Sequence, residues 1–284
     1  MQIIKSEVMG FCFGVRRAVE TAESALQKYG KGVYSLGPLI HNENALKELQ
    51  EKGLLIADEK EISTIKDGSV VIIRAHGVAP DLIETLKNKK CTVIDATCPR
   101  VKANQKMVSR YTSADDYIIL TGDKNHGEVI GLAGYAKSNF IQIQNYDEAE
   151  KVQLPSNLKG QIVLLSQTTY NPLEFSKIES LLKSRYPQIK VQNTICPATE
   201  ERQNALLDLC SKVDALIVIG GKNSANTKRL YQTAKENCKF ALHIQDESEI
   251  PDEIRKYEKI GITAGASTPD KIISLVETAL NNMV

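Results

Sequence analysis

Short apolar runs alternate with longer amphipathic segments along almost the whole chain. Runs such as VVII, YIIL and ALIVI end in a glycine or in a polar turn, which is typical of buried strands. The segments after them repeat apolar residues at helical spacing, and several open with proline. Strands that alternate with helices favour parallel sheets, so the pattern predicts an α/β fold.

An internal repeat organises this pattern. Three stretches resemble one another: GFCFGVRRAVETAESAL around Cys12, DATCPRVKANQKMV around Cys98 and NTICPATEERQNALLDL around Cys196. In each of them a cysteine follows a short turn and precedes a segment with helical spacing. Pro99 and Pro197 stand directly after their cysteines, where a proline commonly opens a helix. The three cysteines therefore mark three equivalent strand-to-helix turns.

Two further landmarks follow each cysteine. In VYSLGPLIHN, YIILTGDKNHGE and ALIVIGGKNSAN a strand-like run ends in glycine, and four residues later stand His41, His126 and Ser224. In SVVIIRAHGVAP, QIVLLSQTTYNP and KIGITAGASTPD a strand runs into a polar turn that contains His76, Thr168 and Ser267. The last copy is looser, since its serine is two residues before the proline rather than four.

The simplest account is three pseudo-repeated α/β units with mostly parallel sheets. The expected units are residues 1–96 with Cys12, His41 and His76; residues 97–194 with Cys98, His126, Glu128 and Thr168; and residues 195–284 with Cys196, Ser224, Asn226 and Ser267. Ligands bind outside the carboxyl ends of parallel strands. Because every landmark falls at a strand-to-helix turn, we expect them to face a common centre.

The cysteine pattern favours a metal cluster. The N-terminus lacks a basic start followed by a long apolar run, so we expect a cytoplasmic protein, where disulfides are rare. None of the six cysteines forms a CxxC pair, which argues against a zinc ribbon. Three thiolates suit zinc or an iron–sulfur cluster, and a structural zinc usually takes a fourth protein ligand, so we favour a cluster with one open iron. The other cysteines, Cys91, Cys210 and Cys238, are expected to be small buried hydrophobes.

The polar landmarks point to a small phosphorylated substrate. Three of the four histidines occupy repeat landmarks, whereas His243 is interpreted as structural. Imidazole and hydroxyl groups at helix N-termini donate hydrogen bonds to anions. No GxxxxGK[ST] sequence is present, which argues against a nucleotide P-loop. Glu128 could donate protons if its pKa is raised, or it could be a first-turn carboxylate that the helix dipole stabilises.

Charge and composition argue against two classes of partner. The net charge is +1 and tryptophan is absent, so neither charge attraction nor base stacking favours nucleic acid. No window of the sequence contains the roughly 18–20 apolar residues that a membrane span requires. We therefore expect neither nucleic acid nor a membrane as a partner.

At this level of detail the sequence resembles a known family. GFCFGV, GPLIHN, RAHGV, DATCP, HGEV, SQTT, NTICPATEERQ and GGKNSAN, in this order, are similar to the motifs of 4-hydroxy-3-methylbut-2-enyl diphosphate reductases. The resemblance extends from Cys12 to Ser267. It implies a three-unit fold around a central [4Fe-4S] cluster and the last step of the non-mevalonate isoprenoid pathway. In this step an allylic hydroxyl group is removed reductively, which gives isopentenyl and dimethylallyl diphosphate.

The resemblance also implies a role for each landmark. Cys12, Cys98 and Cys196 would bind three irons and leave the fourth open to the substrate hydroxyl. The substrate would be bound by His41, His76, His126, Thr168, Ser224, Ala225, Asn226 and Ser267. The catalytic group would be Glu128, Thr168 and His126, with Glu128 as the proton donor. Electrons would come from an external donor, a ferredoxin or a flavodoxin.

The sequence departs from the family pattern at two positions. Gly127 stands between His126 and Glu128, where the family often has proline, so we expect a more mobile loop. Ala225 stands where the family often has a second serine, so one hydroxyl is missing although the backbone N–H remains. Neither change removes a required group.

Two other functions fit three cysteines and phosphate-type donors. One is a non-redox [4Fe-4S] lyase or synthase similar to quinolinate synthase, which would need no electron donor. The other is a metal sensor without catalysis, which would have no open iron.

Overall fold

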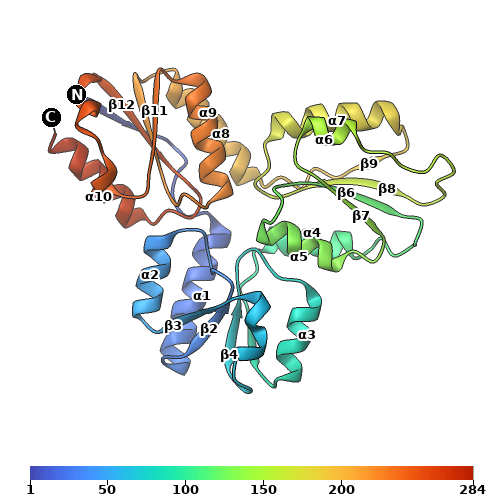
Figure 1. Cartoon of the computed structure of the whole chain (residues 1–284). Coiled ribbons are helices and arrows are strands. Elements are labelled where there is room, and N and C mark those ends of the chain that lie inside the picture. The colour runs from blue at the N-terminus through green and yellow to red at the C-terminus, as the bar shows by residue number, and fades with distance from the viewer. Residues whose placement is uncertain (284) are drawn as a thin grey trace. The chain divides into compact units, whose positions relative to one another are not determined.

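The computed structural model describes residues 1–283. These residues fold around parallel β-sheets. There are three sheets of four strands each, and every strand pair within them is parallel. The predicted α/β class with three parallel-sheet units is therefore confirmed. Figure 1 shows helices packed beside each sheet.

The three sheets repeat one strand order. The first contains, in the order of neighbouring strands, β3 (Leu54–Ala57), β2 (Val33–Leu36), β4 (Val70–Ile73) and β5 (Thr92–Asp95). The second contains β7 (Asn139–Ile143), β6 (Tyr117–Thr121), β8 (Ile162–Ser166) and β9 (Lys190–Val191). The third contains β11 (Phe240–Ile244), β10 (Ala215–Ile219), β12 (Lys259–Ala264) and β1 (Gln2–Lys5).

Helices connect the strands, as parallel pairing requires. The α-helices are α1 (Phe13–Tyr29), α2 (Glu43–Glu51), α3 (Pro80–Asn88), α4 (Pro99–Val108), α5 (Gly127–Tyr135), α6 (Tyr146–Glu150), α7 (Pro172–Arg185), α8 (Pro197–Cys210), α9 (Ala225–Asn237) and α10 (Asp270–Asn281). Short 3-10 helices are η1 (Glu59–Thr64), η2 (Glu247–Glu249) and η3 (Asp252–Lys256). Within residues 1–283 no helix combines the length and the apolarity needed to cross a bilayer.

The strand that leads into each repeat cysteine pairs within the sheet of the preceding copy. β5 precedes Cys98 and β9 precedes Cys196, and both lie at the edge of sheets formed by earlier residues. β1 precedes Cys12 and occupies the equivalent edge of the third sheet, beside β12. The N-terminal strand thus completes the last sheet, although it lies in the range 1–96. The limits of the three expected units stay a prediction.

Apolar residues on both faces of the central strands explain how helices cover the sheets. β10 reads ALIVI and is buried throughout. Ala215, Ile217 and Ile219 pack with α10, whereas Leu216 and Val218 pack with α8 and α9. A strand that is buried on both faces is typical of a parallel sheet between two helix layers.

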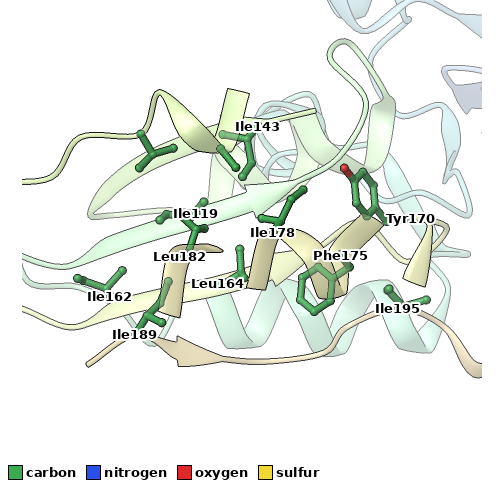
Figure 2. Packing of buried hydrophobic residues seen from close by; sticks show 12 residues of the cluster. Ile119, Ile143, Ile162, Leu164, Tyr170, Phe175, Ile178, Leu182, Ile189 and Ile195 are labelled. Atoms are coloured by element: carbon green, nitrogen blue, oxygen red, sulfur yellow. The ribbon is translucent and has the colours of Figure 1, made fainter. Parts of the chain in front are cut away.

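The second sheet is built in the same way, and Figure 2 shows one of its two cores. Ile119 and Leu164 point from β6 and β8 toward Phe175 and Ile178 of α7. The opposite face of the sheet packs against α4 and α5. The helix that starts directly after Cys98 and the helix that starts directly after His126 therefore share one face of this sheet.

The residues form two compact bodies, each defined by the contacts among its own residues. The terminal body contains Met1–Glu20, Ile40–Lys52 and the chain from Pro197 on, with the third sheet. The middle body contains Thr21–Leu39 and Gly53–Cys196, with the first and second sheets.

Candidate active site

A glycine directly follows β2, β6 and β10, the equivalent inner strands of the three sheets. It begins the turn that leads to the polar landmark residue after that strand. Each glycine donates its backbone N–H to the last residue of the neighbouring strand: Gly37 to Ala57 at 2.7 Å, Gly122 to Ile143 at 2.9 Å and Gly220 to Ile244 at 2.8 Å. His41, His126 and Ser224 each follow their glycine by four residues. These three side chains therefore occupy equivalent turns, as the repeat predicted.

The register of the strands corrects one member of the third landmark, the set His76, Thr168 and Ser267, by one residue. The last paired positions are Leu36 with Ile73, Thr121 with Ser166 and Ile219 with Ala264. Three residues beyond the second member of each pair stand His76, Thr169 and Ser267. The counterpart of His76 and Ser267 is thus Thr169, and the alignment with Thr168 was wrong. SQTT offers two adjacent threonines, and no periodic signal distinguishes them.

Each repeat cysteine is anchored by its backbone to this third turn. The N–H of Cys98 donates to Ala75 at 2.9 Å, that of Cys196 to Thr168 at 2.8 Å and that of Cys12 to Ala266 at 3.0 Å. The three acceptors are equivalent in register. All three thiols are half-buried, and no cysteine within residues 1–283 is in a disulfide. The cysteines thus lie at the carboxyl ends of parallel strands, where ligands bind.

The other cysteines lie in or beside apolar cores. Cys210 is buried in the core that α8 and α9 share with the third sheet, which confirms its expected burial. Cys238 packs against the same core and Cys91 against that of the first sheet, but both are only partly buried. The expected burial is therefore only partly met for these two cysteines.

Glu128 and Thr168 form a buried pair in the middle body. Glu128 is 1% exposed, in the first turn of α5, and Thr168 follows β8. One carboxylate oxygen accepts from the backbone N–H of Thr168 at 2.8 Å, and the other accepts from its Oγ1 at 2.6 Å. The threonine hydroxyl donates its only proton to the carboxylate, so its oxygen can still accept a hydrogen bond from another group.

Two histidines lie beside each other in the same body. The rings of His76 and His126 are perpendicular, with centroids 5.1 Å apart. Nδ1 of His126 accepts from the backbone N–H of Glu128 at 3.2 Å and so caps α5. A neutral ring that accepts at Nδ1 carries its proton on Nε2. His126 therefore presents its Nε2–H donor away from the start of α5.

The terminal body holds the remaining polar landmarks. Ser224 is buried and caps α9, accepting at 3.3 Å from the N–H of Thr227. Ser267 donates its hydroxyl to the carbonyl oxygen of His41 at 2.9 Å, which ties the turn after β12 to the start of α2. Asn226 is 5% exposed, and its Nδ2 has no hydrogen-bond partner among residues 1–283. A buried amide donor without a protein partner is suited to hydrogen-bond an anionic ligand.

Sequence reasoning missed Arg74, which directly precedes the AHG of the RAHGV motif. Its side chain is buried in the middle body and forms an ion pair with Glu59 of η1. Burial lowers the pKa of Arg74, and the carboxylates of Glu59 and Asp58 oppose this shift. The sequence feature that could have revealed Arg74 is a positively charged residue directly after the apolar run VVII.

The fold and these turns define a class: an α/β enzyme with loop-borne cysteines, a buried carboxylate–hydroxyl pair and polar turns at the ends of parallel strands. Comparison with known proteins gives the family. The chain belongs to the LytB protein family, whose family model matches residues 3–281.

Relatives of known name share the full length of the chain. A 4-hydroxy-3-methylbut-2-enyl diphosphate reductase of Treponema denticola is 48% identical over 287 residues, 99% of each chain. A reductase of the same name from Clostridioides difficile is 39% identical and covers 100% of each chain.

Solved structures agree in fold. The E-1-hydroxy-2-methyl-but-2-enyl-4-diphosphate reductase of Plasmodium falciparum matches 99% of this chain and 87% of its own, with a TM-score of 0.89 and 30% identity. A structure described as (E)-4-hydroxy-3-methyl-but-2-enyl diphosphate reductase, the terminal enzyme of the non-mevalonate pathway, covers 99% of each chain at 39% identity with a TM-score of 0.71.

Proposed function

We propose that this protein reduces 4-hydroxy-3-methylbut-2-enyl diphosphate to isopentenyl and dimethylallyl diphosphate, the last step of the non-mevalonate isoprenoid pathway. The observation that carries the proposal is the full-length likeness to reductases of this substrate. The reaction consumes two electrons and two protons and releases the hydroxyl group as water. The site must therefore supply a redox group, a proton path and an anchor for the diphosphate.

The redox group is one [4Fe-4S] cluster held by Cys12, Cys98 and Cys196. The residues fit such a group, because thiolates are the usual ligands and each thiol stands in an equivalent anchored turn. Three cysteine ligands would leave one iron of the cluster without a protein ligand. When bound, the cluster would supply electrons and a Lewis acid at the hydroxyl that leaves.

Thr168 and Glu128 form the proton path. The substrate alcohol donates to Oγ1 of Thr168, whose own proton points to Glu128. Once Glu128 is protonated, this hydrogen bond reverses: Glu128 gives its proton to Oγ1 of Thr168 while Thr168 gives its own proton to the leaving oxygen. The oxygen then departs as water and Glu128 is left as the carboxylate. Glu128 is buried and bonded directly to a hydroxyl group that faces the substrate in this proposal, which suits a proton relay closed to water.

The diphosphate is bound by donors from the equivalent turns. These are His41, His76, His126, Ser224, Asn226 and Ser267, together with the backbone N–H of Ala225. The buried Nδ2 of Asn226 supports this assignment, since it lacks a protein partner within residues 1–283. Nδ2 of Asn226 can stabilise the anion without reorganisation, whereas the hydroxyl of Ser267 must first turn away from the carbonyl oxygen of His41.

An external one-electron donor, a ferredoxin or a flavodoxin, completes the reaction, and we place the protein in the cytoplasm. We also retain the three units 1–96, 97–194 and 195–284 as the repeating parts of the site.

The test is an anaerobic assay with reduced methyl viologen and the hydroxylated diphosphate. We expect two viologen cations to be oxidised per substrate and two five-carbon diphosphates to form. Substrate consumption without viologen oxidation, giving other products than these two diphosphates, would instead identify a non-redox lyase. A cluster-bearing protein that leaves the substrate unchanged would contradict the proposed reductase activity.

A further inference from the structure

We propose that Arg74 is a positioning residue that fixes the turns of His76 and of His126–Glu128 with one buried guanidinium, and that a methyl group at position 127 of this chain would displace it. This inference rests on the proposed function and deepens it. All the contacts that support it lie within the middle body.

Arg74 closes the turn that presents His76. Its backbone carbonyl accepts from the N–H of Gly77 at 3.0 Å, and its Nε donates to the carbonyl of Gly77 at 3.4 Å. Gly77 has a φ of +71°, which L side chains rarely adopt, and a Cβ there would overlap the amide of Gln105. His76 therefore lies within a turn that Arg74 closes by two hydrogen bonds to Gly77.

The same guanidinium packs against the start of α5. A Cβ placed on Gly127 would lie 2.5 Å from Nη2 and 2.8 Å from Cζ of Arg74. No side chain fits at these distances unless the guanidinium moves. Gly127 stands between His126 and Glu128, so the cation touches the turn that carries both. In this chain, Gly127 leaves the space that the guanidinium occupies.

A third contact fixes the guanidinium itself. A Cβ on Gly37, which ends β2, would overlap Nη1 of Arg74, and Glu59 pairs with the other end of the group. The planar fork of arginine is the feature that allows contact with several groups at once. Its charge is compensated by Glu59, so its role is to hold loops and not to bind the substrate anion.

The second sheet offers an internal comparison. Gln167 is the register equivalent of Arg74, and its Oε1 accepts from the N–H of Asp123 at 2.9 Å, in the turn after β6. Each residue therefore contacts the turn after the neighbouring strand: Arg74 follows β4 and lies against Gly37 after β2, and Gln167 follows β8 and bonds Asp123 after β6. Arg74 alone of this pair also reaches a turn of the other sheet, through Gly127. A longer side chain at this position links the two copies in the middle body.

The test is a double-mutant cycle of Gly127→Ala and Arg74→Ala, with Gly131→Ala as the matched control. Gly131 lies on the same helix, where a Cβ would make ordinary contacts of 3.5 Å. We expect Gly127→Ala to lower kcat/KM on the order of 10²-fold, the scale that a displaced catalytic group costs, at full iron content. Gly131→Ala should leave kcat/KM unchanged.

The cycle separates positioning from a merely structural role. In the Arg74→Ala background, Gly127→Ala should cause no further loss, because the guanidinium that it displaces is gone. Arg74→Lys should not restore activity, since it keeps the charge and loses the fork. Inorganic pyrophosphate binding, measured by calorimetry, should weaken in Gly127→Ala and not in Gly131→Ala.

Two results would overturn the inference. One is an equal loss from Gly127→Ala in both backgrounds; the other is a Gly127→Ala enzyme as active as Gly131→Ala. The second comparison decides the matter if Arg74→Ala does not fold. An inactive wild-type enzyme with an intact cluster would instead contradict the proposed function, so the two failures are distinguishable.

Discussion

At the scale of single residues, the burial of Glu128 carries the most specific chemistry. Sequence reasoning left this residue open between a proton donor and a first-turn carboxylate. In the structure it is both in the first turn of α5 and bonded twice to Thr168. An exposed first-turn glutamate would gain the same helix-dipole stabilisation without burial. The burial therefore favours the functional interpretation.

Glu128→Gln should retain the cluster and lose most turnover. The amide keeps the shape and can still hydrogen-bond Thr168, but it cannot release a proton, so kcat should fall by about 10²- to 10⁴-fold. Anaerobic viologen kinetics measure the loss, and iron analysis confirms that the cluster is retained. Thr168→Ser keeps the hydroxyl and should stay active, whereas Thr168→Val should not. Wild-type turnover of Glu128→Gln would remove this residue from the proton path.

His243 illustrates a histidine with a structural role. Its Nε2 lies 2.9 Å from the carbonyl oxygen of Gly220, the glycine that ends β10. Burial lowers the pKa of His243, although the hydrogen bond to Gly220 opposes the shift. A lowered folded-state pKa means that the unfolded chain binds the proton first as the pH falls. This contribution to stability is therefore present above the unfolded pKa and is lost as the pH falls through the folded pKa.

The prediction is a stability that falls from about pH 7.5 to pH 5.5, the range in which histidine titrates. In His243→Gln the amide can still donate to Gly220 but does not titrate, so its melting temperature should fall less over this range. Thermal unfolding of both proteins at the two pH values measures the difference. Parallel pH profiles would show that His243 does not contribute.

At the scale of elements, apolar periodicity predicts the strands and helices well because each is covered by its neighbours. The run QIVLLS becomes β8, which is buried along its whole length between α7 on one face and α4 and α5 on the other. What periodicity cannot give is register, since SQTT satisfies the motif at either threonine. Backbone pairing decides between them, and it matched Thr169 to His76.

Leu164→Ala in β8 should destabilise the protein by about 2–5 kcal/mol, because it removes a fully buried side chain from the core in Figure 2. Leu173 is a matched control of the same residue type, since its side chain is 72% exposed near the start of α7. Leu173→Ala should change stability by no more than about 0.5 kcal/mol. Urea unfolding measures both variants, and equal losses would contradict the assigned core.

At the scale of the whole molecule, the repeat predicted the number and type of sheets, but not how the chain closes them. β1 joins β12 because the strand before each cysteine belongs to the preceding copy. The motif spacing begins at Cys12 and carries no signal for a four-residue strand before it. Arg74 was missed for a related reason, since its contacts with Gly37 and Gly127 join segments that no local pattern connects.

The central claim is that three cysteines, one from each copy of the repeat, hold one cluster. The most direct measurement is iron content after anaerobic reconstitution, in the wild type and in Cys12→Ser, Cys98→Ser and Cys196→Ser, with Cys91→Ser as control. We predict about four irons per chain in the wild type, as a [4Fe-4S] cluster requires. Each repeat variant should lose most of this iron, whereas the control should keep it. Full iron retention in any of the three variants, or no iron in the wild type, would contradict the account.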